Sequence, residues 1–304
     1  MDCRTNNSFE YFDDLSNDGC NNIPDGLKLG NCSSEALTLR LLLGHISLKR
    51  LYENKIVKQN RNYSILPYKT IRKLNYRIFN NAMGIENLQE EETKRICDKY
   101  FLHNRRNSYV HERMLNEISW YFLKEKVSPM ESFVHLYRCL EFVSYSFPMI
   151  YASTSRDYRG TYENLKKFIG GTDTGELKFF RNFLNSLFEP ETYILEYTFE
   201  IPVSSPNLDE LRQEVNEVFN NAKLSFEFDN SMLRIKFKDI ISAFIQVRNR
   251  YFHMLVGSGQ HNVDGIRYDI NDLFKALNPH LLNWLAVIFV KIVQHGYELA
   301  VLYS

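Results

Sequence analysis

Residues 240–253 read Ile240-Ile241-Ser242-Ala243-Phe244-Ile245-Gln246-Val247-Arg248-Asn249-Arg250-Tyr251-Phe252-His253. An apolar helical pattern leads into an arginine–asparagine pair and then, four residues after the asparagine, a histidine. Arginine is a permanent cation whose planar donor fork suits phosphate. Histidine can both take and give a proton near neutral pH. Because RNA supplies its own nucleophile, the 2′-hydroxyl, these residue types can cut it without a metal ion.

The segment from Arg248 to His253 resembles the R-N-x-x-x-H form of the R-x(4–6)-H motif of HEPN-domain proteins. An apolar helical run precedes it, a glycine-rich break at Gly257 and Gly259 follows, and a long apolar helix is expected from Asn278 onward. Upstream, Leu136-Tyr137-Arg138-Cys139-Leu140-Glu141 resembles the opening helix of the HEPN bundle. The resemblance covers roughly residues 110–304. It implies an all-helical bundle, and many members of this family are metal-independent ribonucleases of toxin–antitoxin, CRISPR and phage-defence systems.

Spacing alone does not identify the site, because an arginine five residues before a histidine occurs three times. Requiring asparagine after the arginine removes the Arg40/His45 pair. A second copy remains, Arg106-Asn107-Ser108-Tyr109-Val110-His111. That copy follows a polar, basic stretch, whereas the Arg248 copy ends a hydrophobic helix. Context therefore favours Arg248, Asn249 and His253 as the catalytic set, with Arg106, Asn107 and His111 as the alternative. We expect Arg106 to form an ion pair and His111 to lie on a helix surface.

Helical geometry bears on how the motif could work. Arg248 and His253 are about 140° apart around a helix, whereas Asn249 and His253 share a face. One helix cannot easily close both groups around one phosphate, which favours a site completed by a second copy in a homodimer. Arg250 and Tyr251 could contact a phosphate or a base, although core packing explains Tyr251 equally well. In the purely structural reading, Arg248 forms a surface ion pair and Asn249 is solvated.

Composition limits the possible functions. Lys plus Arg equals Asp plus Glu at 37 each, so RNA contact must be a local patch, as suits an enzyme better than a packaging protein. The five cysteines lack metal-binding spacing and are expected to be free thiols in a reducing cytoplasm, with Cys97 and Cys139 structural. No metal site and no cofactor are expected. The apolar stretches carry too many polar residues to predict a membrane span.

Periodicity predicts a mainly α protein, a HEPN-like bundle with one small sheet inserted. We expect a polar, loosely held arm over 1–34, a helical region acting as a sensor or lid over 35–125, and the bundle over 126–304. Within the helical region, helices are predicted from 33 to about 51 and from 67 to 84. The inserted β-α-β-β unit is predicted at about 191–238, and its first strand over 193–201.

The resemblance and the residues together predict a metal-independent endoribonuclease that attacks through the 2′-hydroxyl, acting as a toxin or abortive-infection effector in antiviral defence. Its partners would be RNA, a second copy of the chain and, in some contexts, an antitoxin or defence protein. The alternative is a non-catalytic HEPN-like module that binds or regulates a partner. Loss of toxicity on substitution of Arg248 and His253 separates the two.

Overall fold

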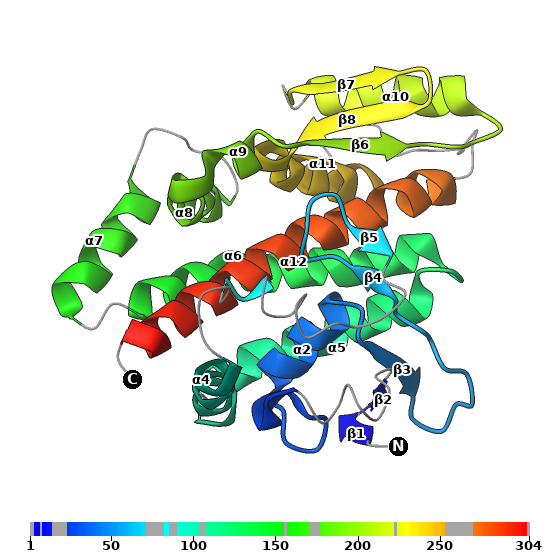
Figure 1. The fold of residues 1–304 in the computed structure, drawn as a ribbon. Coiled ribbons are helices and arrows are strands. Elements are labelled where there is room, and N and C mark those ends of the chain that lie inside the picture. Colours follow the sequence, from blue (N-terminus) through cyan, green and yellow to red (C-terminus); the bar gives the residue numbers. More distant parts are fainter. Residues whose placement is uncertain are drawn as a thin grey trace.

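The computed structural model describes residues 3–6, 8–13, 23–70, 82–84, 90–103, 107–154, 157–170, 177–221, 224–252 and 270–302. These residues are mainly helical, with small antiparallel sheets near each end of the structure, so the predicted mainly α class is confirmed (Figure 1). Up to residue 124, the elements are β1 (Cys3–Asn6), β2 (Phe9–Asp13), η1 (Asp25–Leu27), α2 (Ser34–Leu42), β3 (Ile46–Arg50), β4 (Arg61–Asn62), β5 (Lys69–Thr70), α4 (Glu90–His103) and α5 (Ser108–Lys124).

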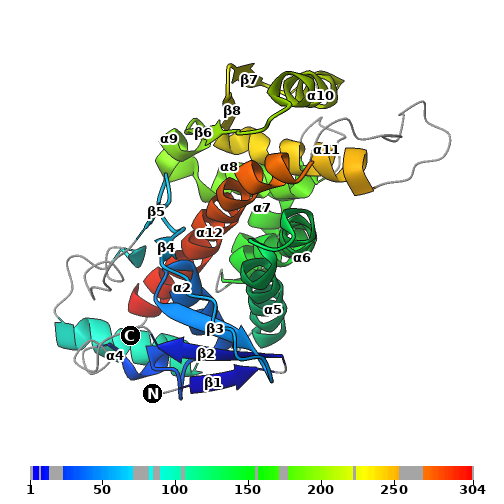
Figure 2. The same ribbon diagram turned by 90° about the vertical axis from the view of Figure 1, so that its right-hand side faces the viewer.

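The remaining elements build the larger helical part and its inserted sheet (Figures 1 and 2). They are α6 (Pro129–Ser153), α7 (Tyr158–Ile169), α8 (Lys178–Leu187), η2 (Glu189–Glu191), α9 (Thr192–Leu195), β6 (Thr198–Pro202), α10 (Leu208–Asn221), β7 (Phe226–Asp229), β8 (Met232–Lys236), η3 (Phe237–Asp239), α11 (Ile240–Phe252) and α12 (Ile270–Leu302).

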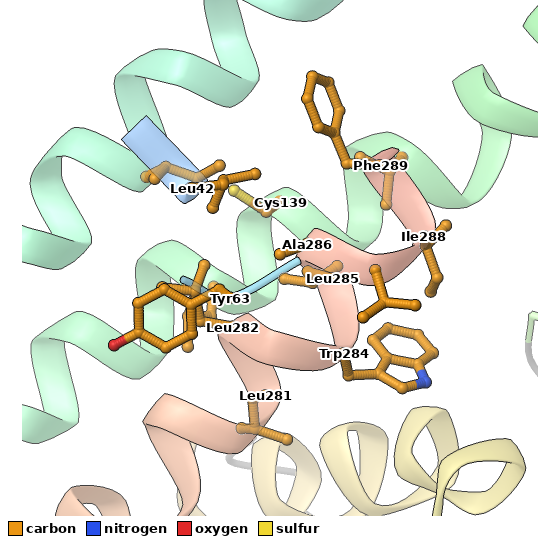
Figure 3. Packing of buried hydrophobic residues seen from close by; sticks show 14 of the residues in the cluster. Leu42, Tyr63, Cys139, Leu281, Leu282, Trp284, Leu285, Ala286, Ile288 and Phe289 are labelled. Atoms are coloured by element: carbon orange, nitrogen blue, oxygen red, sulfur yellow. The ribbon is translucent and has the colours of Figure 1, made fainter. Parts of the chain in front are cut away.

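Helix α12 runs through the middle of the structure and is apolar on all sides. Every residue from Leu281 to Val290 is buried, including Asn283 and Trp284, as expected for a helix enclosed by other elements (Figure 3). Among the described residues it is the one helix long and apolar enough to cross a membrane, but 89% of its apolar window is buried inside the fold. The core helix of a soluble protein has this character, so α12 is weak evidence for a membrane span.

Helices α5 and α6 form an antiparallel hairpin beside α12. The start of α6 follows from its sequence: the Ser128 hydroxyl accepts the Glu131 backbone N–H at 3.4 Å, and Pro129 occupies the first helical turn. Phe133 of α6 packs against Phe274 of α12 with ring centroids 4.9 Å apart. Phe147 of α6 likewise lies 6.2 Å from Phe289. The hairpin thus supplies one wall of the α12 core.

The first residues are not a loosely held arm, and that prediction is wrong for the part described. Strand β2 pairs with β1 on one side and with β3 on the other, in the order β1-β2-β3. The side chains of Phe9 and Tyr11, on one face of β2, are completely buried. The Asp13 carboxylate accepts from the buried Arg40 guanidinium at 2.8 Å. Alternate apolar residues on β2 therefore hold it to the core.

The region 35–125 is only partly helical. Helix α2 begins as predicted, with the Ser33 hydroxyl capping the Ala36 N–H at 3.2 Å, but it ends at Leu42. The chain turns at Gly44, whose φ of +81° favours glycine and where a Cβ would lie 2.8 Å from the Arg61 carbonyl. The chain then enters β3, so the helix predicted to reach 51 stops early. The helix predicted from 67 is wrong at its start, because Lys69–Thr70 is strand β5; residues 71–81 lie outside the described part.

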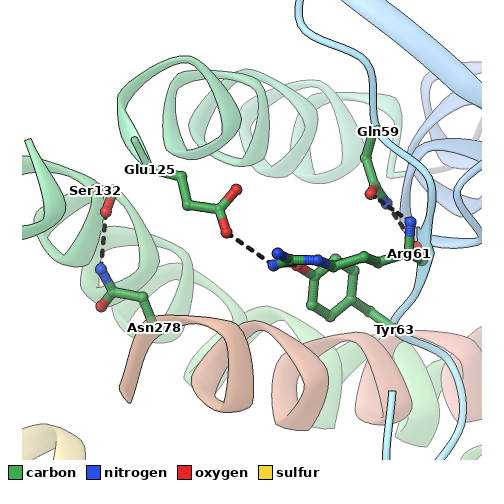
Figure 4. A network of polar contacts seen from close by, with 6 residues as sticks. All are labelled: Gln59, Arg61, Tyr63, Glu125, Ser132 and Asn278. Carbon is green, nitrogen blue, oxygen red and sulfur yellow. Dashed lines mark hydrogen bonds and ion pairs between the residues drawn. The ribbon is translucent and has the colours of Figure 1, made fainter. Parts of the chain in front are cut away.

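Polar side chains fix the segment 59–68 onto the helices, and Figure 4 shows one of them, Arg61, bonded to Glu125. The Asn283 amide donates to the carbonyls of Tyr63 at 2.6 Å and Ile65 at 2.8 Å, and its oxygen accepts the Tyr68 N–H at 3.2 Å. The Arg61 guanidinium donates to Glu125, at the end of α5, at 3.0 Å. One buried amide thus satisfies three backbone groups of an irregular segment.

The β-α-β-β insert is confirmed, with antiparallel strand order β6-β8-β7 and α10 between β6 and β7 in sequence. Its first strand is shorter than predicted, because Thr192–Leu195 forms the helical turn α9 and leaves Tyr193 exposed. The Trp284 indole of α12 donates to the Phe237 carbonyl at 2.9 Å, at the end of the insert. The insert is therefore joined to the helical core.

Replacing Asn283 by alanine should destabilise the protein, because one buried carbonyl, one part-buried carbonyl and one N–H lose their partner. We expect the free energy of unfolding to fall by about 3 kcal/mol in urea titrations. The matched control is Asn182→Ala, whose amide bridges the carbonyls of Phe168 and Gly170 nearer the surface, and which should lose about 1 kcal/mol. Equal losses in the two variants would contradict the assigned role of Asn283.

Candidate functional site

Helix α11 carries the motif at its C-terminal end. Its inner face is buried through Ile241, Phe244 and Val247, and Phe244 lies 5.9 Å from Trp284 of α12. The apolar spacing predicted from the sequence therefore anchors the helix in the core. Arg248 and Asn249 follow immediately and are both half-buried at the edge of the bundle. The core thus fixes the backbone that carries them.

Two side chains contact the Arg248 guanidinium. It lies over the Tyr137 ring of α6, 5.2 Å from the ring centroid, and its Nη1 donates to the Asn249 side-chain oxygen at 2.9 Å. Among the described residues, no carboxylate forms an ion pair with it. The structural alternative of a surface ion pair for Arg248 therefore does not hold within the described part. A half-buried cation held by a ring and a neutral amide keeps its charge available for an anion.

Arg250 is in a different situation. Its Nε donates to the Glu214 carboxylate of α10 at 2.6 Å, and both side chains are largely buried, at 18% and 14% exposure. This hydrogen bond raises the pKa of Arg250 above its ordinary value. Tyr251 packs edge-on against Phe274 with centroids 5.9 Å apart. Arg250 and Tyr251 thus secure the helix to the insert and to α12, which does not favour the substrate-binding role predicted for them.

Phe252 ends α11. Its ring stacks on Phe133 of α6, with centroids 5.6 Å apart and the planes 9° from parallel, and it is 36% exposed. His253 follows directly in the sequence and lies outside the described residues. The described part of α11 therefore ends at Phe252, one residue before His253, the predicted general acid–base.

The alternative motif copy has its histidine in the core. Arg106 lies outside the described residues, and Asn107 precedes α5 with a left-handed φ of 62°. His111 is 4% exposed, with its Nε2 3.8 Å from the Glu35 carboxylate and its ring against Phe289. The prediction of a surface position for His111 is wrong, because the start of α5 packs on α2 and α12. A histidine so enclosed cannot reach RNA from solution.

The Glu35–His111 contact is not a full ion pair at neutral pH. Burial raises the pKa of Glu35 to about 7, against the opposing hydrogen bond that it accepts from Tyr100 at 2.9 Å. Burial lowers the pKa of His111 to about 4, so the ring is neutral at pH 7. Among the described residues, Glu35 Oε2 and His111 Nδ1 have no hydrogen-bond partner. The pair is therefore a buried polar contact of the core.

The first copy, Arg40/His45, is structural as well. The Arg40 guanidinium donates to the Leu27 carbonyl and to Asp13, each at 2.8 Å, from a fully enclosed position. Burial, reinforced by Arg40, lowers the pKa of His45 to about 3. Of the two copies whose arginine is described, the Arg248 copy presents it half-buried at the edge of the bundle, whereas Arg40 is buried.

Sequence reasoning missed two residues of the site, Tyr137 and Glu214. Tyr137 lies in the α6 stretch already compared with the opening helix of a bundle, so a search of that helix for aromatic partners of the motif could have found it. Glu214 has no local signal, because its position depends on how the insert folds back onto α11. Both are contacts between segments far apart in the sequence.

Other candidate chemistry is limited within the described part. Cys97 and Cys139 are free and buried, and burial raises the pKa of Cys97 to about 12, as expected for structural thiols; Cys32 is buried as well. The part of the chain that the structure describes contains no group of three His, Cys, Asp or Glu side chains placed to hold a metal ion.

No family model matches the chain, and no curated protein and no solved structure matches it significantly.

The Glu35→Gln variant should change how stability depends on pH. Because the folded pKa of Glu35, about 7, lies above its ordinary 4.5, the wild type loses stability as pH rises through this window. Glutamine keeps an acceptor for Tyr100 and does not titrate. The unfolding free energy of the variant minus that of the wild type should therefore rise between pH 5 and pH 8, by up to about 3 kcal/mol.

Thermal or urea unfolding at several pH values measures this difference. His111 titrates in both proteins, so its contribution cancels to first order. Glu112→Gln, on the exposed face of α5, is the matched control and should give the flatter profile because water solvates that side chain. A difference for Glu35→Gln that does not vary with pH would contradict the assignment.

Proposed function

We propose that this chain is a metal-independent endoribonuclease of the HEPN type. The observation that carries the proposal is the Arg248 guanidinium, held over Tyr137 and bonded to Asn249, with no ion-paired carboxylate among the described residues. It stands five residues before His253 in the R-N-x-x-x-H pattern. Cleavage of RNA through its 2′-hydroxyl needs an oriented, unneutralised cation at the phosphate and a group that moves protons, the roles proposed for Arg248 and His253.

The proposed reaction is an intramolecular transesterification at one phosphodiester of the RNA. The 2′-hydroxyl loses its proton, its oxygen bonds to the adjacent phosphorus, and the bond from phosphorus to the 5′-oxygen breaks. The departing oxygen takes a proton. His253 serves one of these two proton transfers, and Arg248 stabilises the charge on the phosphate oxygens. The products are a 2′,3′-cyclic phosphate and a 5′-hydroxyl.

Asn249 acts in this proposal by orienting Arg248. Its oxygen accepts one guanidinium N–H, while the Tyr137 ring supports the flat face of the group. An arginine has five N–H donors, so donors remain for a phosphate after the bond to Asn249. This differs from both roles expected from the sequence: in the enzyme, Asn249 would orient the histidine-bearing turn or hold a phosphate oxygen, and in the purely structural reading it is solvated.

The biological setting is part of the same proposal. The enzyme would act in the cytoplasm as a toxin or abortive-infection effector, as a homodimer whose two α11 helices together complete the site. The part before residue 125 would serve as a sensor or lid, packed on the bundle through α2 and α5. The rival, a HEPN-like module without catalysis, predicts cell toxicity that survives loss of both Arg248 and His253.

The first test is cleavage of total RNA in the presence of EDTA. Wild type should cleave, leaving 2′,3′-cyclic phosphate ends, and His253→Ala should be slower by about 10²–10⁴-fold. Arg248→Lys should lose activity because an ammonium cannot replace the fork. Arg250→Lys, on the same helix but paired with Glu214, is the matched control and should lose far less. Cleavage abolished by the chelator, or unchanged in His253→Ala, would overturn the proposal.

A second test concerns the ring beneath Arg248. Tyr137→Leu removes the ring and should lower kcat by about fivefold, because the guanidinium loses about 1 kcal/mol of orienting contact. Tyr137→Phe keeps the ring and should retain most of the activity. Circular dichroism and size-exclusion chromatography check that both variants fold and associate like wild type. Equal activities of the two variants would show that the ring does not orient Arg248.

A further inference from the structure

Helix α6 supports a second arginine in the same manner as Arg248. The Arg113 guanidinium of α5 lies over the Phe142 ring, 4.9 Å from the centroid, and over the Tyr109 ring at 5.5 Å. It also donates to the Tyr109 hydroxyl at 2.9 Å. The side chain is thus held between two rings at the surface. One helix therefore presents two aromatic rings, Tyr137 and Phe142, each beneath an arginine.

Arg113 is exposed, and among the described residues it forms no ion pair with a carboxylate. This separates it from Arg50, which also lies over an aromatic ring, that of Trp120, but is paired with Glu53 at 3.2 Å. An arginine that is fixed and unneutralised can bind a phosphate while losing little conformational entropy. Arg113 and Arg248 share this state.

The two arginines lie on either side of the exposed ridge of α6. Tyr137 and Phe142 are five residues apart, about 7.5 Å along the helix and about 140° around it. Figures 1 and 2 place α6 between α11, which carries Arg248, and α5, which carries Arg113. A strand that reaches both must therefore cross α6. Crossing one helix, about 10 Å wide, with an axial offset of about 7.5 Å makes a span of at least about 12 Å, which a few nucleotides can cover.

The exposed surface beside Arg113 and along α6 carries aromatic rings and little net charge: Tyr109 lies on α5, and Tyr145 lies on α6, three residues beyond Phe142. Tyr109 and Tyr145 are 63% and 65% exposed. A groove of about 480 Å³ beside Arg113 is lined by Glu117, Arg138, Glu141 and Phe142, among others. Glu117 is engaged by His135 at 2.7 Å and by Arg138 at 3.9 Å. Glu141 is the acidic group that opposes a polyanion here.

We propose that Arg113 binds a second phosphate of single-stranded RNA, a few nucleotides from the phosphate at Arg248, while Tyr109 and Tyr145 offer faces for stacking bases. This rests on the proposed function and adds the path of the substrate. Charge complementarity favours a polyanion such as RNA, because neither arginine is ion-paired with a carboxylate among the described residues. Exposed rings select unpaired bases, whose faces are free to stack.

The test is binding of a fluorescent single-stranded RNA to the His253→Ala protein, followed by anisotropy at several salt concentrations. Arg113→Gln should weaken the Kd about tenfold. It should also reduce the slope of log K against log salt by about 0.7, the value for one phosphate contact on a single strand. Arg113→Lys should restore part of the affinity and part of the salt dependence. Arg50→Gln, the ring-supported but paired arginine, is the matched control and should leave binding unchanged.

Two further variants test the path. Glu141→Gln should tighten binding because it removes the opposing charge from the ridge. Tyr145→Ala should weaken binding by about five- to tenfold, whereas Tyr145→Phe should not, since the stacking face remains. RNA binding by Arg113→Gln equal to that of Arg50→Gln would overturn the inference, and so would unchanged binding by Glu141→Gln.

Cleavage assays keep this inference distinct from the proposed function. If wild type cleaves RNA and Arg113→Gln has the same KM, the proposed substrate path over Arg113 is wrong, whereas the proposed ribonuclease activity is supported. If Arg113→Gln weakens binding but wild type does not cleave, the nuclease proposal fails and the RNA surface stands. If the protein neither binds nor cleaves RNA, both are overturned.

Discussion

The structure depends on the enclosure of α12 by segments from the whole chain. Its apolar faces meet α6, α11 and the insert on one side and the segment 59–68, α2 and α4 on the other, and one hydrophobic cluster runs from Phe9 to Tyr297. The regions separated at residue 125 by sequence analysis therefore share a core. Asn283 shows how closely they are joined, because it bonds to backbone more than 200 residues away.

Elements whose signals lie within a few residues of one another could be predicted from the sequence. The α5–α6 hairpin, helices α7 and α8, and the β-hairpin of the insert follow from local periodicity, caps and turns. The N-terminal sheet could not be recognised, because β2 depends on pairing with β3 some 37 residues later. Helix α2 ends at Gly44 because of backbone packing against Arg61, which its own sequence does not reveal.

The same limit applies to the site. The motif and its apolar helix could be read directly, and the asparagine and the sequence context favour the Arg248 copy, but only burial sets the other two copies aside. Arg40 and His111 are enclosed by Asp13 and by Glu35, residues that only the tertiary fold brings near. The contrast between Arg248 and Arg250 likewise depends on the return of α10 to α11. Charge pairing, more than spacing, distinguishes the arginine that is available from those that are not.

The positions of the two tryptophans have a practical consequence. Trp284 lies in the core beneath the insert and bonds to Phe237, whereas Trp120 packs against Phe9 of the N-terminal sheet and stacks on His135. Each indole therefore reports on a different end of the molecule. Variants that keep one tryptophan at a time turn intrinsic fluorescence into two separate optical readings. Coincident emission changes on unfolding would identify a single cooperative unit, and separate ones would reveal which end opens first.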